Sequence, residues 1–549
     1  METPIKISDA HPEPPVRGES LLRKLEEAFL WADRAIERWI PAPYNPLAQT
    51  GALANVSFVI ALLSGVLLLF WYVPSVHQAW GSLKDLGFFG QTARSLHRYS
   101  SDATIFFVLV HAVRMTLARR FAGARWIAWV TGIVLIGLLW LVGWLGYWLV
   151  WDVRAETLAQ ASAQIVEVLP VFTEPLSRSF LLDEMVSTGL FFLVFFLHML
   201  LPLAMGVALW MHISRVSRAR FLTSSVMTAW LFGALIIVSL IFPATSAEKA
   251  QMGAQSGAFT TDWWYLLPLA LTERLSGGAL VAVGRGIAAI ATAVPWWMTR
   301  EKPQKAVVDL ARCNGCAQCV QDCPYNAIIM VPRTDGHPRR EIQAEVAPEK
   351  CVGCGICAGS CNPGGIGLPQ LPVQDERRRF DRWIDEMIEA DEKPCLAFLC
   401  SSSAAADISV GPDGRSAELP GYRIFAVPCA GWVQAMTIER ALRRGAECIL
   451  IAGCQSSDPP YREGVKWTRR RLAGEREPEL RHEKVDTSGV RFVQYNRTQK
   501  REFLAAAAEH RRDNLSSPDR TYTRTGIFVA AALTCIAFAA VIVGFSDAP

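Results

Sequence analysis

Long apolar runs separated by polar stretches divide the chain into a membrane part and a soluble part. A helix needs about 20 mostly apolar residues to cross a bilayer. Seven stretches approach that length, near residues 52–74, 101–118, 126–150, 185–211, 223–243, 277–298 and 525–546. Residues 299–522 carry no such run. The pattern predicts a multi-pass membrane protein with a soluble insert before its last span.

A charged segment, residues 1–44, precedes the first predicted span. Within it, residues 20–40 alternate charged and apolar groups at helical spacing, which predicts an amphipathic helix. Such a helix lies either on the membrane surface or against other parts of the protein, and the sequence favours neither arrangement.

Positive charges set the expected orientation, because cytoplasmic loops of membrane proteins are enriched in Lys and Arg. The second and fourth predicted loops and the end of the sixth span are rich in them, with Arg114, Arg119, Arg120, Arg125, Arg215, Arg218, Arg220, Arg300, Lys302 and Lys305. We therefore expect the amino terminus and the soluble insert on the cytoplasmic side of a prokaryotic inner membrane.

Composition narrows the class of protein further. The chain is 51% hydrophobic, and its net charge of +4 is small and dispersed, which gives no support for nucleic-acid binding. Eight of the 14 cysteines fall in two clusters between residues 313 and 361. That spacing favours metal ligation over disulfides and predicts a reducing compartment.

Two predicted spans carry paired histidines, His97 with His111 and His198 with His212, each pair 14 residues apart. Fourteen residues make about four helical turns, so both members share one face, about 21 Å apart along the axis. Both spans are expected to run from outside to inside, which pairs His97 with His198 and His111 with His212. Facing imidazoles at two depths predict an outer and an inner bis-His haem.

The spans on either side repeat the same spacing with glycine: Gly51 and Gly65, then Gly132 and Gly146. A helix without side chains at two levels lets a flat macrocycle pack on its backbone. Arg94 and Arg114 lie three residues from a histidine, at opposite ends of the bundle, and are predicted to neutralise haem propionates.

Further motifs accompany these residues. They follow one another along the chain as GYWLVWD (146–152), His198 with Leu201-Pro202, and WYLLPLALTERL (264–275). Together they make residues 45–300 resemble cytochrome b of the quinol-oxidising bc complexes. The resemblance implies two b-type haems and a quinone pocket in an all-α bundle.

One position departs from that family. The family carries Pro-Glu before the Trp-Tyr of the last motif, and its Glu helps to take a proton from quinol. Here Asp262-Trp263 precede Trp264-Tyr265. Asp262 is either a substitute proton acceptor at a quinone site or a solvated loop charge.

Residues 313–324 read CNGCAQCVQDCP, and residues 351–363 read CVGCGICAGSCNP. Both follow C-x2-C-x2-C-x3-C, the spacing of bacterial two-cluster ferredoxins, in which the fourth Cys ligates the other cluster. The predicted [4Fe–4S] ligand sets are Cys313, Cys316, Cys319 and Cys361, and Cys351, Cys354, Cys357 and Cys323. Because zinc sites use ligands in two pairs, the motifs favour an α+β ferredoxin domain over residues 301–372.

After a predicted linker, residues 373–393, strand and helix signals alternate through residues 394–512. Strands are expected at 395–400, 422–428, 447–452 and 490–495, and helices at 432–445, 462–473 and 498–511. This alternation predicts a small parallel sheet covered on both sides. Cys400, Cys429 and Cys454 each follow a strand, at the edge where ligands bind in such sheets.

AFLCSSSAAAD (397–407), VPCAGWV (427–433) and GCQSSDPPY (453–461) make this stretch resemble the iron–sulfur delta subunit of methyl-viologen-reducing hydrogenase. The resemblance implies a flavoprotein partner similar to that of heterodisulfide reductase. The family usually has two more cysteines, where this chain has Ser and Pro. Either Cys395 completes a four-Cys [2Fe–2S] site with Cys400, Cys429 and Cys454, or the cluster is lost and the domain serves only as a docking module for a partner. Cys448 is expected to be an ordinary buried residue.

The predicted fold is a multidomain membrane protein: a transmembrane cytochrome b-like bundle with about seven spans, a cytoplasmic α+β ferredoxin domain, a small α/β domain and a last helix at 523–546. The predicted function is electron transfer between a cytoplasmic flavin or iron–sulfur enzyme and the quinone pool, with further oxidoreductase subunits as partners. Quinol-driven reduction of a cytoplasmic acceptor, and a redox sensor or scaffold, stay open. A transporter is disfavoured, because we expect no polar span residue beyond the haem ligands.

Overall fold

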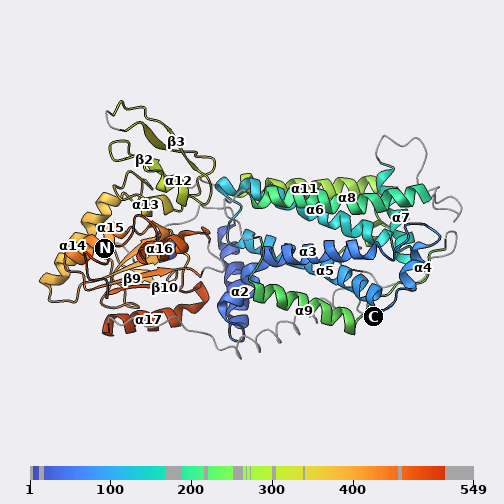
Figure 1. Ribbon diagram of the computed structural model, residues 1–549, viewed down its shortest axis with the longest axis horizontal. Helices are drawn as coiled ribbons and strands as arrows, with labels where there is room; N and C mark the ends of the chain where they lie inside the picture. Colours follow the sequence, from blue (N-terminus) through green and yellow to red (C-terminus); the bar gives the residue numbers. More distant parts are fainter. Residues whose placement is uncertain are drawn as a thin grey trace.

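The computed structural model describes residues 4–10, 18–168, 188–214, 221–251, 262, 264–266, 269–272, 274–299, 304–337, 340–455 and 460–513. A bundle of long helices forms one end of an elongated molecule, and the soluble part forms the other (Figure 1). The predicted last span, and most of the arginines and lysines of the fourth-to-fifth loop and the end of the sixth span, lie outside the described residues.

Five described helices are long and apolar enough to cross a membrane. They are α3 (Thr50–Leu68), α5 (Phe88–Leu117), α6 (Trp126–Trp148), α8 (Thr188–Ile213) and α11 (Gly277–Met298). A shorter apolar helix, α9 (Ser225–Ile241), has 17 residues. These helices coincide with six of the predicted spans, although α5 begins well before the predicted residue 101.

The helices of the bundle pack in two main pairs. Helix α3 lies along α5, and α6 lies along α8. Helix α9 joins the first pair, where Leu53, Leu96 and Leu235 share one buried cluster. Short helices α4 (Ala79–Lys84) and α7 (Val153–Val166) lie at the end of the bundle away from the soluble part (Figure 1).

The amphipathic helix α2 (Glu19–Glu37) lies between the bundle and the soluble part (Figure 1). Its Leu22 packs with Leu117 and Phe121 at the bundle end. On its other side, Glu26 accepts a hydrogen bond from Arg497 of the soluble part at 3.0 Å. The structure thus packs one side of α2 on protein, and contact of its exposed Leu21 and Trp31 with the membrane surface stays a prediction.

The first soluble unit has the predicted α+β character. Strand β2 (Val307–Val308) pairs antiparallel with β5 (Ile366–Gly367), and β3 (Ile328–Pro332) pairs antiparallel with β4 (Ile342–Val346). Two short helices, α12 (Gln318–Asp322) and α13 (Ile356–Gly359), follow the cysteine-rich loops.

The second soluble unit is a four-stranded parallel sheet in the order β10-β9-β6-β8. Its strands are β6 (Cys395–Cys400), β8 (Arg423–Val427), β9 (Cys448–Gly453) and β10 (Val490–Gln494). Helices α15 (Ala435–Arg443), α16 (Gly464–Leu472) and α17 (Lys500–Asp513) cover it. The structure therefore confirms the predicted strands and helices to within a few residues.

The amino terminus joins this second unit, which the sequence did not predict. Strand β1 (Ile5–Lys6) pairs antiparallel with β7 (Ser409–Val410). Ile7, the first residue of α1 (Ile7–Ala10), is 1% exposed and packs in the same core as Phe503. The first described residues are thus held by the last domain.

The expected linker is a helix, and the two soluble units share one core. Helix α14 (Val373–Glu389) packs Phe380 edge-on against Phe398 and Phe425 of the sheet. Across the units, Arg471 donates to the buried Asp322 at 2.7 Å. Removing one partner of such a buried ion pair costs about 3–5 kcal/mol, so this contact fixes the two units firmly.

Candidate electron-transfer sites

The structure brings together the predicted outer pair of histidines. The rings of His97 on α5 and His198 on α8 have centroids 6.2 Å apart and planes at 77°. A metal–imidazole bond is about 2 Å, so this separation suits two rings on opposite faces of one metal.

Hydrogen bonds select the ring nitrogen that is free to bind a metal. The Nδ1 atom of His97 lies 2.8 Å from the carbonyl oxygen of Ala61, and that of His198 lies 3.0 Å from the carbonyl oxygen of Val142. Because a carbonyl only accepts, each Nδ1 must carry the proton and donate. In a neutral imidazole, the lone pair then resides on Nε2, which is the arrangement of a metal-binding histidine.

The inner level repeats this arrangement with a side-chain acceptor. The Nδ1 atom of His212 lies 2.9 Å from Oγ1 of Thr131. That hydroxyl donates its own proton to the carbonyl oxygens of Ile127 and Ala128 in α6. It therefore accepts from His212, whose Nε2 is again left with the lone pair.

The four glycines of the 14-residue pattern face the four histidines. Gly51 faces His111, Gly65 faces His97, Gly132 faces His212 and Gly146 faces His198. An added Cβ would lie between 2.9 and 3.4 Å from the nearest ring atom in each case. The imidazoles thus lie against these glycines, and the packing of a macrocycle on the same backbone stays a prediction.

A cavity lies at the outer level, lined by both members of the pair. Its wall includes His97, His198, Gly65, Gly146 and Arg94. Two imidazoles with free Nε2 atoms, held on glycines beside this cavity, fit a bis-His haem. The inner pair has the same glycines and the same tautomer at His212, so the residues present fit two haems.

The two arginines have different surroundings. Arg94 lines the outer cavity and donates to the carbonyl oxygen of Leu83 at 3.2 Å and to Oγ of Ser246 at 2.8 Å. Arg114 donates to the carbonyl oxygen of Leu47 and lies 4.0 Å from Asp33. Their role toward haem propionates stays a prediction, and Arg114 already has a carboxylate as neighbour.

Asp262 is not a solvated loop charge, which was one of the two alternatives left open by the sequence. It is 1% exposed and accepts hydrogen bonds from Arg98 at 2.5 Å and from Tyr147 at 2.6 Å. It also accepts from the backbone N–H groups of Trp264 and Tyr265 at 2.6 and 2.9 Å. The sequence did not identify Arg98 or Tyr147, which line the same cavity as the outer histidines.

The eight clustered cysteines all lie in the first soluble unit, and their division into two ligand sets stays a prediction. Six of the eight are buried. Burial raises the pKa of Cys319 and of Cys354 to about 12, so bare thiols here would stay protonated. Backbone N–H groups point at the sulfurs, from Gly365 to Cys361 at 3.2 Å and from Ala327 to Cys323 at 3.4 Å. Buried thiols with N–H donors suit iron–sulfur clusters, because the iron stabilises the thiolates.

Three cysteines of the second unit are buried at the carboxyl ends of strands, as predicted. A hydrogen bond with Cys454 lowers the pKa of Cys400, and burial followed by the charge of Cys400 raises the pKa of Cys429. A side chain at Gly464 would collide with Sγ of Cys429. Within the described residues, no three His, Cys, Asp or Glu side chains are close enough to hold a single metal ion.

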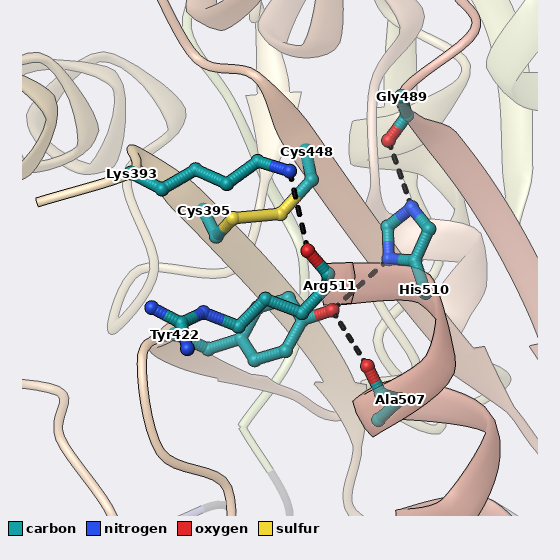
Figure 2. The surroundings of a disulfide bond; sticks show 8 residues. All are labelled: Lys393, Cys395, Tyr422, Cys448, Gly489, Ala507, His510 and Arg511. Carbon is teal, nitrogen blue, oxygen red and sulfur yellow. Dashed lines mark hydrogen bonds between the residues drawn. A yellow bond between two sulfur atoms is a disulfide. The ribbon is translucent and has the colours of Figure 1, made fainter. Parts of the chain in front are cut away.

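The fourth proposed ligand of this site, Cys395, is a wrong prediction. Its Sγ forms a disulfide with Cys448, its neighbour on the adjacent strand (Figure 2). Cys395 and Cys400 occupy opposite ends of β6, about 16 Å apart at the rise of a strand. Both disulfide cysteines are fully buried, so a soluble thiol has no direct access to them.

The cysteine sites and the bundle are in contact, which the sequence did not reveal. Cys354, Cys429 and Trp467 belong to one buried cluster, against which Tyr461 packs. Arg125, just before α6, donates to the carbonyl oxygen of Pro460 at 3.1 Å and lies over the Tyr461 ring at 5.5 Å. The set of Cys351, Cys354, Cys357 and Cys323 therefore lies between the α/β unit and the membrane bundle.

The fold and these sites define a membrane-bound electron-transfer protein with haem-binding and iron–sulfur segments. Comparison with known families agrees. Residues 36–220 match the family model of cytochrome b/b6/petB, residues 306–364 match the 4Fe-4S dicluster domain, and residues 395–513 match the delta subunit of methyl-viologen-reducing hydrogenase. The chain is thus a fusion of segments similar to these three families, as its motifs predicted, and the matches imply haem b and iron–sulfur clusters.

Among solved structures, the chain is similar to one titled "Hyperthermophilic respiratory Complex III". The two chains are 17% identical over 47% of this chain and 76% of the other, with a TM-score of 0.37. At this distance the likeness adds nothing to the assignment of the sites.

Proposed function

We propose that the chain is the membrane subunit of an oxidoreductase complex in a prokaryotic inner membrane. It carries electrons between a cytoplasmic flavin or iron–sulfur enzyme and the quinone pool. The observation that carries the proposal is the unbroken contact from Cys429 through Cys354 and Tyr461 to Arg125, at the start of the helix that supports the inner histidine.

Haem b and iron–sulfur clusters supply one-electron transfer when bound. His97 and His198 would hold the outer haem, and His111 and His212 the inner haem. Ala61, Val142 and Thr131 orient the imidazoles through their Nδ1 atoms.

The two cubane sets have different positions in the proposed path. Cys354 lies in the buried cluster with Cys429, and the charge of Arg125 acts on it, opposing part of the rise in pKa that burial causes. Cys316, in the other set, is exposed. We assign the set that contains Cys354 to exchange with the bundle, and the set that contains Cys316 to exchange with a soluble partner.

The soluble partner is the part of the proposal that rests on family likeness. The delta-subunit match supports a flavoprotein partner similar to that of heterodisulfide reductase. The three cysteines at the strand ends, Cys400, Cys429 and Cys454, are the residues that we assign to a third cluster, with no ligand from Cys395.

At the quinone site, Asp262 is proposed to position groups rather than to accept a proton. Its carboxylate already accepts from Arg98, Tyr147 and two backbone N–H groups, so a quinol hydroxyl would have to displace a strong donor. Its bonds hold Tyr265 against α6, where Gly143 leaves space for the ring.

The test is a redox-titrated visible spectrum of the purified full chain with iron analysis, followed by mixing of the reduced protein with a quinone analogue. We expect two b-type haems and about eight or more non-haem irons, eight of them from the two cubane sets, with haem oxidation by the quinone within the mixing experiment. Ten irons would support a third cluster. One haem, or none, would contradict the bundle assignment, and haems that quinone does not oxidise would favour a sensor or scaffold.

A further inference from the structure

Helix α11 carries a charged residue within its membrane-spanning length. Arg285 is the ninth of its 22 residues, so about 12 Å of helix separates it from the Gly277 end and about 20 Å from the other end. The hydrocarbon core of a bilayer is about 30 Å thick, which places Arg285 inside it. The expectation that no polar span residue remains beyond the haem ligands is therefore wrong.

Arg285 differs from the other arginines of the described spans. Arg94, Arg98 and Arg114, all on α5, each donate to a carbonyl or carboxylate oxygen. Arg285 is exposed and makes no hydrogen bond or ion pair within the described part of the chain. In hydrocarbon, an arginine without an acceptor is costly and is normally found facing protein or water.

The surface around Arg285 is open on every side. Residues 282–290 are all exposed, and Val283, Ile287 and Ile290 are large apolar groups among them. Within the described residues, the contacts of the helix lie on either side of residues 282–290. Trp129 of α6 donates to the carbonyl oxygen of Ala291 at 2.7 Å, and Gly277 abuts the backbone of Gln164.

Charge complementarity limits what can cover this surface. A second copy of the chain offers no free carboxylate at this depth, because Asp102 is the one acidic residue in the described spans and it is buried beside Arg98. The apolar run at residues 525–546 contains no Asp or Glu. Neither the described spans of a second copy nor the run at residues 525–546 therefore supplies a carboxylate for Arg285.

We propose that residues 282–290 of α11 are the docking surface for a different membrane-spanning chain, which places an Asp or Glu of its own span against Arg285. The surrounding Val283, Ile287 and Ile290 would pack on the apolar face of that span. This surface lies apart from the histidines and cysteines and does not depend on the proposed direction of electron flow.

The test places a photo-crosslinking amino acid at Ile287 of the full chain in its native membrane. A second position, Ile237 on α9, is the control, because it is also an exposed apolar residue of the bundle, 53% exposed against 64% for Ile287. We expect one crosslinked membrane polypeptide, distinct from this chain, at position 287 and none at 237. Its yield should fall at least tenfold in Arg285→Leu and persist in Arg285→Lys, with haem content unchanged in both.

A charge exchange then identifies the acidic partner residue. Arg285→Asp should abolish the crosslink, and Arg in place of the intramembrane Asp or Glu of the captured chain should restore it. Crosslinks only to lipid or to a second copy, no crosslink, a yield that does not depend on Arg285, or failure of the exchange would each overturn the proposal. Loss of haem in Arg285→Leu would overturn it as well, by placing Arg285 in the bundle.

Discussion

Each histidine at the haem levels depends on a second helix for its space, and His97, His198 and His212 also depend on it for their tautomer. On α3, Gly65 leaves room for the His97 ring, and Ala61, one turn earlier, accepts from its Nδ1 atom. On α6, Gly146 and Val142 do the same for His198. A helical carbonyl has a second lone pair, so one turn of helix with a glycine can seat an imidazole without losing its own hydrogen bond.

Replacement of one of these glycines should therefore remove one haem. In Gly65→Ala, the new Cβ would lie 2.9 Å from Cε1 of His97, closer than such atoms pack, and the ring would have to leave its acceptor. We expect the ratio of haem to protein to fall from two toward one. Gly137→Ala in α6 is the control, because nothing lies within 4 Å of its added Cβ. Equal haem loss in both variants would contradict a specific seat for the imidazole.

The hydroxyl of Thr131 should affect both the retention and the midpoint potential of the inner haem. Thr131→Val keeps the shape of the side chain but removes the acceptor for Nδ1 of His212. Loss of such a supporting contact typically costs 10- to 100-fold in metal affinity or activity, so we expect weaker retention of one haem and a changed midpoint potential. Both are measurable by redox titration. Thr116→Val, whose hydroxyl bonds only the carbonyl of Ala112, should leave both unchanged.

At the scale of elements, the sequence predicted the helices and strands whose hydrophobic pattern repeats over many residues. It missed one highly charged helix and one very short strand. The spans and the parallel sheet follow from periods of about 3.6 and 2 residues. Helix α14 was overlooked because it is highly charged, although Val373, Phe380, Ile384 and Met387 lie on one helical face. Strand β1 has two residues and exists only through its partner β7. No local signal predicts such a strand.

Strand geometry also decides the ligand set of the second soluble unit. Cys395 is the first residue of β6 and Cys400 is its last, so the two cysteines lie at opposite ends of the strand. Cys395→Ser should leave the iron content of the purified protein unchanged. Cys429→Ser should lower it by about two irons if the third cluster is present, with a smaller iron–sulfur absorbance. If only the Cys395 variant lost iron, Cys395 would be a cluster ligand after all.

For the whole molecule, the order of contacts differs from the order of segments along the chain. The amino-terminal strand belongs to the last domain, and the loop before α6 contacts residues near position 460. The sequence predicted the modules because their ligands recur at fixed spacings. It could not predict the junction, because the junction depends on single residues hundreds of positions apart, such as Arg125 and Pro460.

This junction makes Arg125 the residue whose loss should separate the two halves functionally. Arg125→Ala removes the bond to Pro460 and the contact with the Tyr461 ring, while all predicted ligands remain. Haem and iron contents should therefore be normal. Loss of these contacts would loosen the junction and lengthen the distance that an electron crosses between cluster and haem. We expect haem reduction through the clusters to slow by tenfold or more, measured by stopped-flow absorbance with a soluble reductant.

Two control variants distinguish this effect from a general loss of positive charge at the same end of the bundle. Arg125→Lys keeps the cation and should slow the transfer less than alanine does, because an ammonium still reaches a carbonyl but loses the planar contact with an aromatic ring. Arg34→Ala removes an exposed cation of helix α2 and should change nothing. If all three variants transferred electrons at the same rate, electrons would enter the bundle elsewhere, and the cluster beside Arg125 would lose its place in the path.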